Sequence, residues 1–160
     1  MESIGLEKQL MTQSTVMKTF LWYQNDLEGA LEFYRKIFGD VVIRNENRMG
    51  PDAPLFTAEF TIFGHEFTGM CIEGGTAFNN SISLSIQCDG QEETDRLWDA
   101  ITAEGQAGQC GWCTDKWGVS WQVTPFQMRE YLSNVDPSKA QANWAALRSM
   151  TKIVLTDFVS

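Results

Sequence analysis

The cysteines are the residues of this sequence with the clearest potential for chemistry. Cys110 and Cys113 have the C-x-x-C spacing that serves either thiol exchange or one half of a zinc site. A redox pair normally lies at a helix N-terminus, and a closed zinc site needs a second pair. Here the motif falls in an expected strand, and the sequence holds no second C-x-x-C. We therefore interpret the pair as structural and expect Cys71 and Cys88 to be small buried residues.

His65 is the single histidine of the chain, which limits imidazole-based metal binding and base catalysis. It follows Gly64 in an expected turn. A surface position is therefore favoured over a catalytic one.

The six tryptophans raise the alternative of a stacking site for a ligand. The strand and helix patterns place Trp22, Trp98 and Trp121 toward helices or the core. Trp112 and Trp117 flank an expected hairpin and are the better candidates for a ligand-facing ring. Packing is the favoured interpretation for these two as well.

Length and composition are those of one globular domain, or of two small modules that share a core. Of 160 residues, 43% are hydrophobic and 21% charged, and the formal net charge is −9. This acidity, without any Lys/Arg cluster, argues against nucleic-acid binding. No apolar stretch has the length of a membrane span, and residues 1–17 lack the pattern of a signal peptide. We expect a cytoplasmic protein with reduced cysteines and no membrane partner.

The first half of the chain predicts a strand, a helix and three further strands. Aromatic and β-forming residues over 18–23 are typical of a strand. Asn25 or Asp26 is the expected cap of a helix with apolar residues at helical spacing, and Gly39 ends it. Strands are then expected over 41–44, 55–63 and 66–72.

The same order of elements begins again at residue 81. Ile82, Leu84 and Ile86 alternate with polar residues over 81–88, which indicates a half-buried strand. A helix is expected over 89–105, followed by strands over 108–114 and 119–124 with a turn that ends at Gly118. Asp136-Pro137 then begins a last helix.

A shift of 64 residues superposes the two halves of the chain. It pairs Phe20 with Leu84 and Trp22 with Ile86, and it also aligns the apolar positions of the two helices. Because side chains alternate between the faces of a strand, this register decides which residues share a face.

Residues 31–39 resemble the first helix of the glyoxalase/bleomycin resistance/dioxygenase superfamily, also called the vicinal oxygen chelate superfamily. Two segments, GQCGW at 108–112 and DKWGVSWQ at 115–122, resemble the closing segment of its PhnB-like branch. The tail over 136–150 is similar to that branch too. The resemblance covers about residues 18–152. It implies an α+β fold of two βαβββ modules whose mixed sheets form a cleft, plus a C-terminal helix. It also implies a homodimer.

On this basis we divide the chain into four parts. They are a flexible leader (1–17), a first βαβββ module (18–75), a second βαβββ module (76–130) and a C-terminal helical extension (131–160).

The resemblance also indicates where metal-using relatives carry His or Glu ligands. These positions correspond to Thr19, Ser83 and Gln122, and a fourth falls within 71–73 in a register that stays open. Hydroxyl and amide side chains are weak ligands for catalytic divalent metals. We therefore expect no metal and no cofactor. The polar lining is expected to hydrogen-bond a small ligand instead.

Members of this branch often carry the label 3-demethylubiquinone-9 3-methyltransferase domain. A methyltransferase of the doubly wound type needs a glycine-rich loop after its first parallel strand. The sequence contains no such strand–loop–helix unit. The label alone therefore predicts no activity.

Three functions follow from these observations. The favoured one is binding of a small molecule, without turnover, in a metal-free cleft. The second is an enzyme of the superfamily, a lyase, a dioxygenase or the labelled methyltransferase, with catalytic residues unassigned. The third is a structural dimer with a closed apolar cleft. The expected cleft residues are Thr19, Tyr23, Ser83, Gln87, Trp112 and Gln122.

Overall fold

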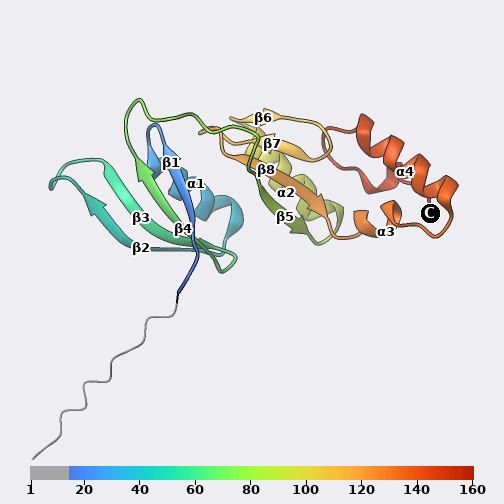
Figure 1. The fold of residues 1–160 in the computed structure, drawn as a ribbon, viewed down its shortest axis with the longest axis horizontal. Helices are drawn as coiled ribbons and strands as arrows, with labels where there is room; N and C mark the ends of the chain where they lie inside the picture. Colours follow the sequence, from blue (N-terminus) through green and yellow to red (C-terminus); the bar gives the residue numbers. More distant parts are fainter. Residues whose placement is uncertain (1–14) are drawn as a thin grey trace, which may run out of the picture.

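The structure, a computed structural model, describes residues 15–160 and consists of two successive four-stranded modules and a helical extension (Figure 1). Residues 1–14 of the expected leader lie outside the described part. The predicted α+β class with two βαβββ modules is confirmed. The elements are β1 (Thr19–Tyr23), α1 (Leu27–Phe38), β2 (Val41–Arg48), β3 (Leu55–Ile62), β4 (His65–Cys71), β5 (Leu84–Cys88), α2 (Gly90–Thr102), β6 (Gln106–Ala107), β7 (Trp112–Thr114), β8 (Ser120–Pro125), α3 (Met128–Leu132), α4 (Pro137–Ser149) and the 3₁₀ helix η1 (Leu155–Asp157).

Both sheets are mixed and have the same topology. The first has the order β1-β4-β3-β2 and the second β5-β8-β7-β6. In each sheet the first strand runs parallel to the last one, whereas the remaining pairs are antiparallel. Parallel pairing places Thr19, at the start of β1, opposite Phe67 in β4. The residues at the start of β1 therefore lie beside the β3–β4 turn.

Local sequence explains the elements around that turn. The side chain of Asp26 accepts a hydrogen bond from Gly29 N (3.1 Å) at the start of α1, and Gly39 ends the helix with φ 74°. Phe63 and Gly64 join β3 to β4 with φ values of 49° and 75°. Two central residues with positive φ are the mark of a tight hairpin turn that matches the strand twist.

Each sheet has one face toward a helix and one open face. In β1 the side chains of Leu21 and Tyr23 are buried against α1, and Tyr23 is 0% exposed. Phe20 and Trp22 point to the other face and are 57% and 39% exposed. The prediction that Trp22 faces a helix or the core is therefore wrong, whereas Trp98 and Trp121 are buried as predicted.

The uniform shift of 64 residues pairs buried positions within the two helices, such as Tyr34 with Trp98 and Ile37 with Ile101, although it matches neither the helix starts nor the first strands. The strands end at Tyr23 and Cys88, 65 residues apart, and the helices begin at Leu27 and Gly90, 63 residues apart. The second connection is two residues shorter. The shift of 64 thus pairs the exposed Phe20 with a core-packed residue of β5, and this prediction is wrong for the strand faces.

Two strand boundaries differ from the sequence prediction for identifiable reasons. The strand expected over 81–88 begins only at Leu84, where pairing with Trp121 begins; Asn79 Oδ1 accepts from Ser81 N (2.9 Å) in a turn before it. The strand expected over 108–114 is interrupted, because Cys110 and Gly111 have φ values of 58° and 81° and reverse the chain between β6 and β7.

The C-terminal extension packs on the second module through that same reversal. Cys110 N donates to Met150 O (2.8 Å), and Gly111 N donates to Thr151 O (2.7 Å). A separate apolar cluster that includes Leu147, Met150, Ile153 and Phe158 holds the extension together. None of the helices within residues 15–160 combines the length and hydropathy that a membrane span requires.

Candidate functional site: a cleft between the two modules

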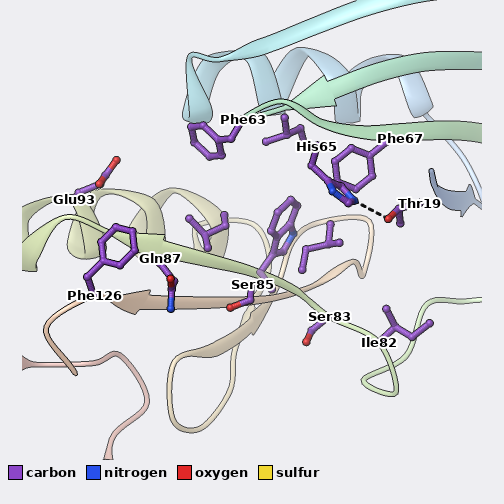
Figure 2. Close-up of a pocket in the computed structure, with 14 residues that line it drawn as sticks. Thr19, Phe63, His65, Phe67, Ile82, Ser83, Ser85, Gln87, Glu93 and Phe126 are labelled. Atoms are coloured by element: carbon purple, nitrogen blue, oxygen red, sulfur yellow. Dashed lines mark hydrogen bonds between the residues drawn. The ribbon is translucent and has the colours of Figure 1, made fainter. Parts of the chain in front are cut away.

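A cleft of about 680 Å³ lies between the first sheet and strand β5 of the second (Figure 2). The start of β1 and the β3–β4 hairpin form one wall, and β5 with Trp121 of β8 forms the other. The lining residues are Thr19, Ile62, Phe63, His65, Phe67, Ile82, Ser83, Leu84, Ser85, Ile86, Gln87, Glu93, Trp121 and Phe126.

A hydrogen-bonded pair of side chains forms the polar end of this cleft. Thr19 Oγ1 and His65 Nε2 are 2.9 Å apart, and both residues are accessible to solvent. The imidazole packs edge-on against Phe67, with ring centroids 4.7 Å apart and an angle of 72° between the rings. The aromatic contact and the hydrogen bond together orient His65 (Figure 2).

Aromatic and aliphatic side chains make up most of the remaining surface of the cleft. Phe63 contributes its ring from a backbone conformation with positive φ, which is uncommon for a bulky residue. Unusual backbone geometry at a bulky residue is often found at functional sites. Phe63 also packs against Phe38, with 5.6 Å between ring centroids.

Of the six residues that the sequence indicated for the cleft, three line it and three do not. Thr19, Ser83 and Gln87 line it. Trp112 and Gln122 are paired across β7 and β8 on the open face of the second sheet, where Gln122 Nε2 donates to Ser83 Oγ (2.7 Å). Tyr23 does not line the cleft, because it is fully buried and its hydroxyl is hydrogen bonded to that of Tyr34 (3.2 Å).

Sequence reasoning missed most of the first wall, above all His65. The residue is solvent-exposed, but it begins β4 and faces the cleft rather than open surface (Figure 2). The expected pairing of strands could have indicated this position of His65. Parallel pairing of β1 with β4 brings Thr19, His65 and Phe67 to the same end of the sheet. Phe126, just after β8, was missed as well.

The residues at the positions of the relatives' metal ligands do not form a metal site. Thr19 and Ser83 offer only hydroxyls, and the amide of Gln122 donates to Ser83. Within residues 15–160 no three His, Cys, Asp or Glu side chains are grouped so that they could hold a metal ion. This donor chemistry does not fit the divalent metal that the superfamily implies.

The cysteines offer a direct test of the structural interpretation of the C-x-x-C motif. Burial raises the pKa of the Cys88 thiol to about 11 and that of Cys113 to about 12. Because the thiolate is the reactive form, we expect native iodoacetamide labelling at pH 8 to modify Cys71 and Cys110 at least about tenfold faster. Peptide mass spectrometry measures this ratio. Fast labelling of Cys113 would contradict the buried, inert thiol.

The fold and the cleft together define a glyoxalase-type protein of the vicinal oxygen chelate superfamily. The family model described as 3-demethylubiquinone-9 3-methyltransferase matches residues 15–124. The chain therefore belongs to this PhnB-like family. No match was found among curated proteins.

Solved structures agree with this assignment. A putative 3-demethylubiquinone-9 3-methyltransferase, PhnB protein, from Bacillus cereus is 27% identical with a TM-score of 0.63, over 69% of this chain and 99% of that one. A protein from Pseudomonas aeruginosa is 17% identical with a TM-score of 0.58, over 70% and 98%. The fosfomycin resistance protein FosX from Listeria monocytogenes is 16% identical with a TM-score of 0.50, over 68% and 88%. The last two show the fold alone.

Proposed function

We propose that this chain binds a small molecule in the cleft between its two modules without the help of a metal ion. The observation that carries the proposal is the lining of the cleft, in which aromatic and aliphatic side chains surround a few polar ones, among them the hydrogen-bonded pair Thr19 and His65. Ligand pockets have this composition, and their volumes of about 300–1,000 Å³ include that of this cleft.

The relatives support the fold of the site but not its chemistry. FosX is described in complex with Mn(II) and 1S,2S-dihydroxypropylphosphonic acid, so a protein of this fold can hold a small molecule. The ligand-equivalent residues of this chain lack the donors for such a metal. Neither sheet is a doubly wound parallel sheet, so the fold does not support a methyltransferase of the doubly wound type.

Filling the cleft with a larger side chain tests this proposal. In a thermal-shift screen of small molecules, we expect the wild type to be stabilised by some compounds, because ligands that bind the folded state raise its stability. His65→Trp should remove that stabilisation, since it places a bulky ring at an accessible position of the lining. Isothermal titration calorimetry then checks each hit.

Val135→Trp is the matched control for this experiment. Val135 is exposed between α3 and α4, outside the cleft lining, so the added indole should leave ligand binding unchanged. Loss of binding in both variants, or retention in both, would show that the ligands bind elsewhere.

A second candidate function is metal-free catalysis, and the Thr19–His65 pair is the observation that favours it. A hydroxyl within 2.9 Å of an imidazole nitrogen has the geometry of a nucleophile and its general base. If mass spectrometry detects conversion of a bound compound and Thr19→Val abolishes that conversion, the chain is an enzyme. Binding without conversion favours the first proposal.

We also propose that the chain forms a homodimer in the cytoplasm. The exposed Phe20, Trp22 and Val42 on the helix-free face of the first sheet support self-association, and the four unpaired cysteines support a reducing compartment. Sedimentation equilibrium should give twice the chain mass, and Phe20→Glu with Trp22→Glu should reduce it to one chain. A wild type that sediments as a single chain contradicts the dimer.

A further inference from the structure

We propose that the ligand of the inter-module cleft is a neutral, ring-containing molecule with a hydrogen-bonding group directed to Thr19 and His65. This inference rests on the proposed function and adds to it the chemical class of the ligand. Three features of the cleft carry it: its aromatic walls, its charge and the position of its polar pair.

Aromatic side chains approach the cleft from both of its walls. Phe63 is exposed on the side of the first sheet and Phe126 on the side of the second (Figure 2). Phe67 and Trp121 also belong to the lining, but they are only 3% and 2% exposed and lie beneath the surface of the two walls. Aromatic pairs prefer offset or edge-to-face contacts with ring centroids about 4.5–7 Å apart, which a planar ligand between two such walls can satisfy. A ring system is therefore the group that this surface fits.

The charges of the cleft disfavour an anionic ligand. The lining contains no lysine or arginine, and its one carboxylate is that of Glu93. The nearby Arg96 lies outside the lining and donates to Ile37 O (2.7 Å). A phosphate or phosphonate here would lose its hydration without gaining a charged hydrogen-bond partner, which costs free energy.

The polar pair fixes where the ligand carries its hydrogen-bonding group. An imidazole can donate or accept, and so can a hydroxyl. Thr19 and His65 form one hydrogen bond with each other. Each can form a further hydrogen bond with a ligand in the cleft. A hydroxyl or carbonyl on the ligand's ring, directed to this end, therefore finds a partner without any formal charge.

Three naphthalene compounds separate these contributions experimentally. The probes are 1-naphthol, its phosphate ester 1-naphthyl phosphate, and naphthalene, each titrated into the full-length protein with tryptophan fluorescence as the readout. We expect 1-naphthol to bind at least about tenfold tighter than 1-naphthyl phosphate. His65→Ala should weaken 1-naphthol binding by about five- to tenfold and leave naphthalene binding unchanged, because only the naphthol loses a hydrogen bond.

Equal or tighter binding of the phosphate ester overturns the neutral class while the binding function stands. An equal effect of His65→Ala on naphthol and naphthalene overturns the role of the polar pair. If none of the three probes binds, the ring-containing class is overturned. In that case the small-molecule function survives only through a compound of another class whose binding His65→Trp removes.

Discussion

Asp115→Ala is expected to lower the free energy of unfolding by about 3–5 kcal/mol, the largest stability effect of any single side-chain removal discussed for this protein. Asp115 is 2% exposed and lies in the turn between β7 and β8. Its carboxylate accepts hydrogen bonds from Tyr34 Oη (2.7 Å) and Trp121 Nε1 (2.9 Å). It also accepts from two backbone amides, those of Trp117 and Val119, both at 3.0 Å.

These contacts join the two modules. Tyr34 belongs to α1 of the first module, and every other partner belongs to the second. Burial raises the pKa of Asp115, and the hydrogen bonds act in the opposite direction by stabilising the charged form. Removal of the carboxylate leaves the buried donors Trp121 Nε1 and Val119 N without an acceptor and also removes the hydrogen bonds of Tyr34 and Trp117, which is why the cost exceeds that of one lost hydrogen bond.

Urea unfolding measures this effect, with two comparison variants. Asp52→Ala, in an exposed loop, should change stability by less than about 0.5 kcal/mol. Tyr34→Phe removes the inter-module hydrogen bond together with the one to Tyr23, and it should cost about 1–2 kcal/mol. An Asp115→Ala protein as stable as Asp52→Ala would show that the network does not hold the modules together.

Gly105→Ala is expected to cost about 3 kcal/mol or more, because the backbone leaves no room for a side chain there. A Cβ atom on Gly105 would lie 1.9 Å from Thr114 O and 2.7 Å from Ile101 O. Both are backbone atoms, so α2 and β7 would have to move apart. That movement disturbs the packing beneath the second wall of the cleft.

Gly50→Ala is the control for the same substitution in open space. Its nearest atom would be Ala53 Cβ at 4.0 Å, and neither glycine has a positive φ. Thermal unfolding of both variants should show a large loss for Gly105→Ala and almost none for Gly50→Ala. Equal losses would show that the close approach of backbone atoms at Gly105 does not set the cost, since the loss of unfolded-state entropy on Gly→Ala by itself stabilises the folded protein.

Local signals in the sequence were sufficient to predict most helices and strands, but not which side of a strand is buried. Asp26, Gly39 and the apolar spacing between them identify α1 to within its observed bounds. The chain reversal at Cys110 between β6 and β7 was not predicted, because a non-glycine residue adopts a positive φ there and no residue propensity indicates this.

The candidate site was predictable only in part. The family register indicated Thr19 and Ser83, and both line the cleft. However, the first strands of the two modules are 65 residues apart, so a uniform shift of 64 is wrong by one residue there and exchanges the two faces of the strand. His65 reaches the cleft through pairing between segments distant in sequence, so its position depends on tertiary contacts rather than on its own turn.

The most direct test of the proposed binding site is calorimetric titration of the strongest compound from the screen into protein treated with EDTA. We predict about one ligand per chain, an affinity that EDTA and added Mn²⁺ leave unchanged, and loss of binding in His65→Trp but not in Val135→Trp. Binding that appears only after a metal is restored, or that survives in His65→Trp, would contradict a metal-free ligand site between the two modules.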